Sequence, residues 1–263
     1  MRDFYRNTAP APLDQADGLR RLFSGRRRRF LPVAANPHVA FAGVVIDRVA
    51  SALAARGRHV LVVDAADRSP EPHELAQLDL AVCVEAMSPQ VSYLAARGLP
   101  LAHVDTRGSA VGFLEAVAHA APQADVVLMH ANAPDLARMF MRRAARPMLL
   151  GADHPESIKH AYAACKLLAQ RCGLMTFDLL LAAGSQSRRV PSIAASLASC
   201  ADGFLGAVLH DWALIDPAEE PGTEPDMALA RMLTAQLALE EDLLPGAVRN
   251  VPGEHRLPSM NTN

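Results

Sequence analysis

The residue types that most often carry chemistry are present in this chain, but not at the spacings that such chemistry requires. The sequence holds no GxSxG nucleophile elbow, no HExxH zinc helix and no GxGxxG dinucleotide loop. Its ten histidines are scattered. The sequence therefore predicts no catalytic residue, no metal ligand and no bound cofactor.

Cysteine spacing points to the same conclusion. The four cysteines, Cys83, Cys165, Cys172 and Cys200, are too far apart to form CxxC pairs, and no closely spaced histidine pair accompanies them. We interpret them as reduced residues of the core, in preference to metal ligands.

Two polar segments could attract anions. SQSRR (185–189) follows a predicted strand, and either a ligand-binding loop or an ordinary polar loop would explain it. Four arginines at 26–29 could attract nucleic acid or anionic lipid, but their position beside Ser24-Gly25 favours a solvated basic linker. The 263-residue chain has a formal net charge of -2, with 21% charged residues, which gives no indication of nucleic-acid binding.

The elements that must position any site alternate from residue 30 onward. A strand at 30–35, a helix at 43–57 and a strand at 59–66 come first. Further strands are predicted at 79–86, 100–106, 124–131, 146–152, 177–184 and 204–210. The clearest helix is PESIKHAYAACKLLAQRCG, with a proline in its first turn and a glycine at its end. This alternation predicts an α/β domain at 30–245 with a doubly wound, mostly parallel sheet.

Both ends of the chain differ from this domain in composition. Residues 1–25 are expected to be disordered apart from a short helix at 14–23, which would be marginal in isolation. A last helix is predicted at 227–244, and residues 246–263 are expected to form a disordered tail. Because no segment offers eighteen uninterrupted apolar residues and the N-terminus lacks an apolar run, a cytoplasmic protein is expected.

The order of elements over residues 30–216 resembles the MinD/ParA group of P-loop ATPases. The stretches that carry the resemblance are ALAARGRHVLVVDAA, HPESIKHAYAACKLL and FLGAVLHDWALID. It implies a three-layer MinD-like P-loop NTPase fold.

The resemblance also implies that the nucleotide site is degenerate. Members of the group carry a GKGGVGKT-like loop, whereas this chain has NPHVAFAG, beginning at Asn36. Pro37 stands at the signature lysine and has no backbone N–H, Ala42 replaces the phosphate lysine, and Gly43 replaces the magnesium-binding hydroxyl. ATP binding is therefore not expected.

Three further parts of the family's site differ. Asp64 is retained, but Ala66 stands at the water-orienting aspartate, and His130 stands where an aspartate holds magnesium. The turn at 182–184 lacks the adenine-recognising asparagine. We expect Asp64 to cap a helix or loop and His130 to be a strand-end residue whose hydrogen bonds are satisfied. The chain is thus predicted to be a pseudo-ATPase and not an enzyme.

Within this group, the N-terminal DQADGLR matches the DQAxxLR element of the flagellar number regulators FlhG and FleN, at Asp14, Gln15, Ala16, Leu19 and Arg20. The resemblance implies that this helix binds and stimulates the signal-recognition-particle-type GTPase FlhF, and that Gln15 orders water there. Leu22 and Phe23 are counted with the binding residues. The alternative is a helix packed on its own domain.

The resemblance further implies recruitment to the cell pole or flagellar base, and contact with flagellar switch proteins of the C-ring is an open possibility. Nucleic acid is not an expected partner. MinD relatives often bind membrane through a C-terminal helix, but the one at 227–244 ends in Glu240-Glu241-Asp242, which anionic lipid repels. Membrane contact is therefore expected to be at most weak or indirect.

Two alternatives stay open. One is a MinD-like ATPase with an atypical nucleotide loop. The other is a degenerate MinD-type scaffold, like those of pilus or cellulose secretion systems, that would bind through its sheet edge or helices.

Overall fold

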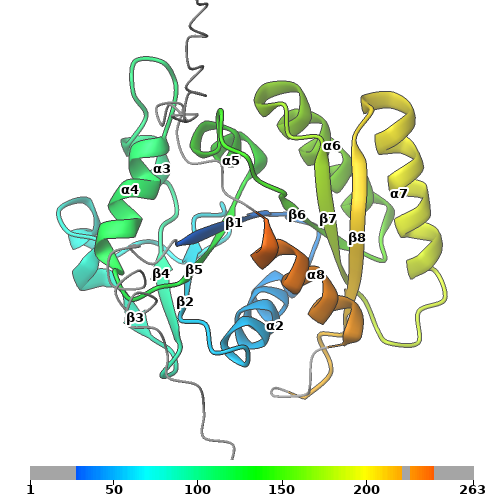
Figure 1. The fold of residues 1–263 in the computed structure, drawn as a ribbon, viewed down its shortest axis with the longest axis horizontal. Coiled ribbons are helices and arrows are strands. Elements are labelled where there is room, and N and C mark those ends of the chain that lie inside the picture. Colours follow the sequence, from blue (N-terminus) through cyan, green and yellow to red (C-terminus); the bar gives the residue numbers. More distant parts are fainter. Residues whose placement is uncertain (1–27, 221–225, 240–263) are drawn as a thin grey trace, which may run out of the picture.

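Parallel strands form the central layer of the protein. Within the part of the chain that the computed structural model describes, residues 28–220 and 226–239, eight strands form one sheet in the order β3-β4-β2-β5-β1-β6-β7-β8 (Figure 1). They are β1 (Arg29–Ala34), β2 (Val60–Asp64), β3 (Glu85–Ala86), β4 (Val91–Ala95), β5 (Val126–Ala131), β6 (Met148–Ala152), β7 (Thr176–Ala182) and β8 (Val208–Ile215). Neighbouring strands are parallel except for β3 and β4.

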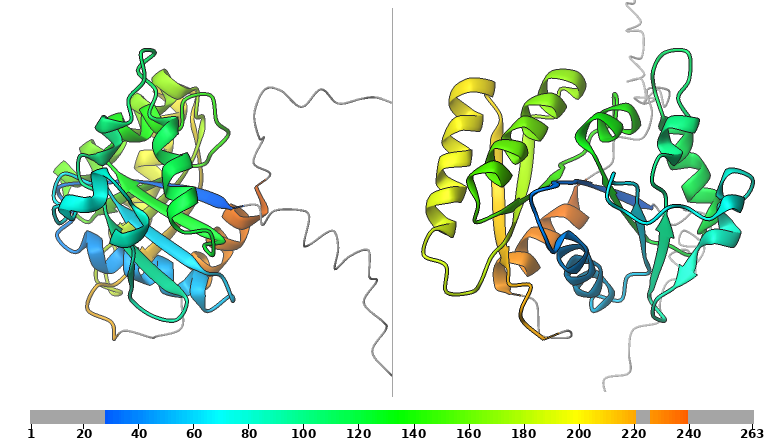
Figure 2. Two further views of the ribbon diagram at one scale, coloured as in Figure 1. Left: turned by 90° about the vertical axis from the view of Figure 1, so that its left-hand side faces the viewer. Right: turned by 180° about the vertical axis from the view of Figure 1, so that it is seen from behind.

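Helices cover both faces of this sheet, which confirms the predicted doubly wound α/β fold. One face packs against α2 (Ala42–Ala54) and α8 (Met227–Ala238). The other packs against α3 (Leu99–Ala102), α4 (Val111–Ala120), α5 (Ala133–Met139), α6 (Pro155–Cys172) and α7 (Val190–Leu205). Two short 3-10 helices, η1 (Glu74–Gln77) and η2 (Ala81–Cys83), precede β3. Figure 2 shows the layers from two further directions.

The apolar runs of the central strands explain this arrangement. Successive side chains of a strand point to opposite faces, so a strand covered on both sides must be apolar throughout. In β2, Leu61 and Val63 join the core beneath α3 to α7, whereas Val60 and Val62 join the core beneath α2 and α8.

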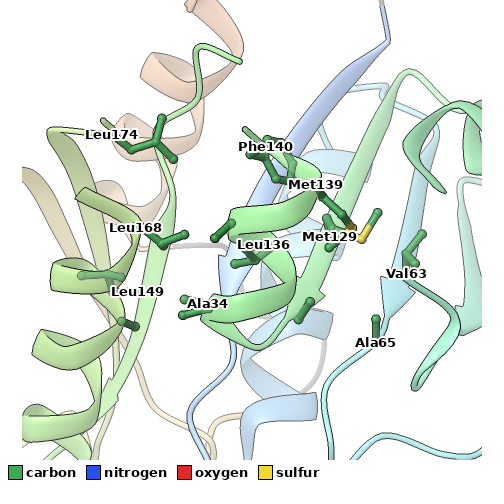
Figure 3. Packing of buried hydrophobic residues seen from close by; sticks show 14 of the residues in the cluster. Ala34, Val63, Ala65, Met129, Leu136, Met139, Phe140, Leu149, Leu168 and Leu174 are labelled. Carbon is green, nitrogen blue, oxygen red and sulfur yellow. The ribbon is translucent and has the colours of Figure 1, made fainter. Parts of the chain in front are cut away.

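Helix α5 closes the first of these cores over the middle of the sheet. Its residues Leu136 and Met139, with Phe140 at its end, lie over Ala34 of β1 and Met129 of β5, and all five are buried (Figure 3). Burying a large apolar side chain contributes roughly 1.5–3 kcal/mol to folding. This packing fixes the strand ends at which the β1 and β5 loops begin.

The clearest predicted helix and the last predicted helix are both present in the described residues. Helix α6 begins at Pro155 and ends before Gly173, which adopts a left-handed φ of 68°. Helix α8 packs on the domain over residues 227–238 through Leu229, Met232 and Leu233. None of the helices in the described part combines the length and apolar character needed to cross a bilayer.

Two predicted strands are wrong. Residues 79–86 form η2 and the two-residue strand β3, and residues 100–106 begin inside α3. Gly98, with a φ of 77°, and the following Pro100 start that helix. The full-length strand of this region is β4, which the sequence pattern does not predict.

The predicted basic linker at 26–29 overlaps the domain. Arg29 is the first residue of β1. Arg28 donates hydrogen bonds to the carbonyl oxygens of Ala124 and Ala121, each at 3.0 Å. Burial lowers the pKa of Arg28, and the charge of Asp125 opposes that effect. The other two arginines of the run lie outside the described residues.

Candidate functional site

A cavity of ≈ 470 Å³ opens at the carboxyl ends of β1, β2 and β5. Loops at this edge of a parallel sheet commonly form ligand sites, because the connections diverge there to opposite faces. The cavity is lined by Ala35, Asn36, Pro37, Val39, Ala40, Ala42, Ala66, Asp67, Arg68, His130, Asn132, Ala133, Pro134, His160, Ala163, Ala164 and Leu167. Five of the eight residues of the predicted degenerate loop therefore line the cavity, and Gly43 is not among them.

Asn36 holds the β1–α2 loop in place. Its buried Nδ2 donates to the carbonyl oxygens of Leu150, at 2.8 Å, and Ser157, at 2.9 Å. Its Oδ1 and its backbone oxygen accept hydrogen bonds from the backbone N–H groups of His38, at 3.0 Å, and Val39, at 3.1 Å. Two amides of the loop are thus directed inward to the chain itself.

The backbone of this loop does not form an anion-binding nest. Such nests alternate right-handed and left-handed residues, so that successive N–H groups converge on one ligand. Among the described residues, those with positive φ are Arg142 and five glycines, and none of them lies between residues 35 and 43. At Gly43 a Cβ would meet nothing within 4 Å, so lack of space does not explain the missing hydroxyl.

Two strand-end residues form the polar centre beside the loop. Asp64 of β2 and His130 of β5 are directly paired in the parallel ladder. Their side chains meet, with Nδ1 of His130 2.7 Å from Oδ1 of Asp64. Ser69 Oγ also donates to Asp64 Oδ1, and Tyr93 of β4 donates to Oδ2 at 3.3 Å. Asp64 thus closes the loop after β2, as expected of a cap, and also orients a histidine.

The environment of Asp64 favours its ionised form. Burial by itself raises its pKa, but the hydrogen bond and charge of His130, with hydrogen bonds from Ser69 and Ala66, lower the pKa below its usual value. Burial and the nearby carboxylate raise the pKa of Tyr93, which keeps that hydroxyl a donor.

His130 departs from the expectation of satisfied hydrogen bonds. Its ring is buried and lines the cavity. Nε2 has no hydrogen-bond partner in the described part of the protein, whereas Nδ1 has Asp64. Only one of the two ring nitrogens of His130 therefore has a hydrogen-bond partner among the described residues.

Histidines also lie on the opposite side of the loop. The rings of His38 and His160 are 5.9 Å apart. Burial lowers the pKa of His160, the charge of His38 adds to that effect, and a hydrogen bond to Ala35 opposes it. His160 is the member of this pair that lines the cavity.

The other sequence-derived candidates lie away from this centre. In SQSRR, Ser187 Oγ donates to Asp153 at 2.8 Å and Arg189 pairs with the same carboxylate at 3.2 Å, so this loop is bound to an acidic residue of its own chain. Cys165 is buried, which raises its pKa to about 12, but Cys200 is exposed, so the expectation of core cysteines is wrong there. No group of three metal-ligating side chains occurs among the described residues.

Sequence patterns miss part of the centre. Ser69 lies in a loop after β2, and Tyr93 lies on the strand β4 that the pattern does not predict. The parallel register of β2 and β5 could have indicated the Asp64–His130 pair, because both residues lie near the carboxyl ends of predicted strands. The predicted partner-binding residues, Asp14, Gln15, Ala16, Leu19, Arg20, Leu22 and Phe23, lie outside the described residues, as does the tail at 246–263.

Comparison with known proteins places the fold. No family model matches the sequence, and no curated protein sequence matches it. The MinD cell division protein of Aquifex aeolicus is 12% identical, with a TM-score of 0.53 over 79% of this chain and 97% of that one. MinD of Pyrococcus horikoshii, complexed with Mg-ADP, is 14% identical, with a TM-score of 0.52 over 80% of this chain and 97% of its own.

A third structure is an enzyme. Cobyrinic acid a,c-diamide synthase of Mycobacterium smegmatis, with a bound ATP analogue and magnesium, is 16% identical, with a TM-score of 0.55 over 80% of this chain and 94% of its own. Similarity at these identities establishes the fold alone. The chain therefore has the expected three-layer, MinD-like P-loop NTPase fold.

Proposed function

We propose that this chain is a FlhG-like pseudo-ATPase, which binds and stimulates an FlhF-type GTPase through its DQAxxLR segment and so regulates flagellum number or placement. The observation that carries the proposal is the β1–α2 loop, in which Asn36 bonds to Leu150 and Ser157 and directs loop amides inward. A protein with this loop is suited to acting without a nucleotide cycle.

The free energy of the missing phosphate contacts supports the proposal that the chain does not bind ATP. A hydrogen bond to a charged group contributes about 1.5–3 kcal/mol, so losing two such contacts weakens binding by roughly a hundredfold or more. Ala42 and Gly43 supply neither the cation nor the hydroxyl, and Pro37 supplies no amide. His130 stands where a hard oxygen ligand for magnesium would be needed, and neutral imidazole suits that cation poorly.

The activator role rests on Asp14, Gln15, Ala16, Leu19 and Arg20, which match the DQAxxLR element. Gln15 is the residue proposed to order the attacking water on the GTPase, because a side-chain amide both donates and accepts hydrogen bonds. The domain would then hold and deliver the segment.

GTP hydrolysis by the cognate FlhF-like protein tests this proposal. We expect the full chain to stimulate hydrolysis and Gln15→Ala to abolish the stimulation. Arg21→Ala is the matched control, because Arg21 lies in the same segment but outside the match, and it should stimulate normally. A full chain that leaves the GTPase rate unchanged would refute the proposal.

A scaffold is the second candidate, and one surface favours it. Leu78, Val82 and Met87 are exposed around the short edge strand β3. Such a scaffold would bind its partner through this edge, so deletion of residues 1–25 would leave binding intact. The activator proposal predicts that the same deletion removes binding to the GTPase.

A further inference from the structure

One residue that lines the cavity at the strand ends carries a buried hydrogen-bonding atom without a partner among the described residues. His130 is 5% exposed, and its Nε2 has no hydrogen-bond partner in the described part of the protein. His130 also lines the cavity. A buried polar atom of this kind is costly in a folded protein unless a partner reaches it.

Asp64 determines which nitrogen of the His130 ring carries a proton. Its carboxylate lies 2.7 Å from Nδ1, so that nitrogen carries a proton and donates it to the hydrogen bond. With this proton on Nδ1, Nε2 is the nitrogen that is free to accept a hydrogen bond when the ring is neutral. Because Ser69 and Tyr93 also bond to Asp64, the carboxylate is held in place and the ring orientation is fixed.

The rest of the cavity indicates the size and polarity of a matching ligand. Its volume of ≈ 470 Å³ is within the range of small-molecule pockets, roughly 300–1,000 Å³. Most of its wall is apolar, with Val39, Pro134 and Leu167 as the larger members.

The charged lining residues do not select an ion. Asp67 and Arg68 are neighbours of opposite charge, both exposed, and Arg68 already donates to the carbonyl oxygen of Pro37 at 2.6 Å. A neutral ligand therefore suits the cavity better than an anion or a cation.

We propose that this cavity binds a small, neutral, largely apolar molecule that donates one hydrogen bond to Nε2 of His130. This inference rests on the proposed function, because it requires that nucleotide does not occupy the same edge of the sheet. The loss of phosphate-binding groups would thus have turned the position into a site for a ligand of different chemistry.

Three probes of similar size separate hydrogen bonding from simple burial. Phenol donates one hydrogen bond, anisole has the ring and oxygen but no donor, and toluene has neither. Titrated into the full chain, phenol should bind about three- to tenfold more tightly than anisole or toluene, as one hydrogen bond implies. The nitrogen chemical shift of His130 Nε2 should move saturably with phenol alone.

Variants locate the binding. His130→Phe keeps a ring but removes the acceptor, so the preference for phenol should vanish. Because that change also removes the histidine partner of Asp64, Ala163→Leu provides a second variant. Ala163 is exposed on α6 and lines the cavity, so enlarging it should weaken phenol binding without disturbing the core. His119→Gln, on the exposed face of α4, should bind phenol as the wild type does.

The outcomes are distinct. Equal binding of phenol and anisole, or an Nε2 signal that reports only exchange with water, would overturn the inference. Addition of magnesium and ATP alone tests the underlying function separately. Displacement of phenol by ATP would overturn the pseudo-ATPase proposal and the inference together, whereas failure of phenol to bind overturns only the inference.

Discussion

Arg146 and Asp178 form an ion pair beneath α8, with Nε of the guanidinium 2.9 Å from Oδ2 of the carboxylate. The side chain of Asp178 is 0% exposed. From α8, Gln236 donates to the same Oδ2 at 2.7 Å and to the carbonyl oxygen of Arg146 at 2.8 Å. Burial raises the pKa of Asp178, and Arg146, Gln236 and His210 oppose that effect. The last described helix is therefore bonded to a buried charge pair.

Removing one member of this pair should be strongly destabilising. Arg146→Met leaves the carboxylate of Asp178 buried without its cation, so we expect a loss of about 3–5 kcal/mol in the free energy of unfolding. Urea denaturation of the wild type and the variant measures this loss. Lys159→Met breaks the exposed Lys159–Glu156 pair of α6 and should cost less than about 1 kcal/mol. Equal losses would show that the buried pair has no special role.

Helix α8 should contribute to stability through one face only. Met232 is 0% exposed in the core shared with α2, whereas Met227, at the first position of the helix, is 83% exposed. Met232→Ala should lower the free energy of unfolding by about 2–5 kcal/mol, and Met227→Ala should change it by about 0.5 kcal/mol or less. Similar small changes in a thermal or urea unfolding series would indicate that α8 detaches from the sheet.

Asn36 should matter for stability although it lies in a loop. Asn36→Ala removes the donor that bonds to the carbonyl oxygens of Leu150 and Ser157. Because buried polar groups are then left without a partner, the free energy of unfolding should fall by about 1–3 kcal/mol. Asn36 Nδ2 also bonds to Ser157 Oγ at 3.1 Å. A double-mutant cycle with Ser157→Ala should therefore give a coupling of about 0.5–3 kcal/mol. Additive losses would contradict the proposed role of this loop residue.

The Asp64–His130 pair should give stability a particular dependence on pH. The pKa of Asp64 is lowered in the folded state, because His130, Ser69 and Ala66 outweigh burial. Its contribution is therefore present above the unfolded pKa of about 3.9 and is lost as pH falls through the lower folded value.

Replacing His130 tests the sign of that contribution. In His130→Phe, burial remains but the main contact that lowers the pKa of Asp64 is gone, so the destabilisation caused by the substitution should grow from pH 3 to pH 5. This interval lies below the ordinary titration range of histidine. Urea denaturation at pH 3, 4 and 5 measures it, and a destabilisation independent of pH would refute the assignment.

The sequence predicts the central strands well, because strands that are buried on both faces consist almost entirely of apolar residues. A run such as Leu179–Leu180–Leu181 is apolar on both faces and fits a parallel strand covered on both sides. The errors fall where burial is incomplete. Val82 belongs to an apolar run but is exposed near β3, and β4 begins Val91-Ser92-Tyr93, whose mixed polarity hides a strand.

The site was harder to predict than the fold. Residue substitutions at Pro37, Ala42 and Gly43 are visible in the sequence, but the bonds of Asn36 to Leu150 and Ser157 join residues more than a hundred positions apart. That His130 has a hydrogen-bond partner at one ring nitrogen and not at the other depends on strand register and on which nitrogen meets Asp64. Such facts are properties of three-dimensional packing, which residue order alone does not specify.

The inward bonds of Asn36 have a consequence for how such a protein could be controlled in a cell. If the chain binds no nucleotide, as proposed above, this loop would keep one shape whether ATP is scarce or abundant, and the output of the protein would not follow the energy charge of the cell. The adjustable quantity would then be the number of copies present. Synthesis and degradation would set the response, and small changes in folding stability would alter that number directly.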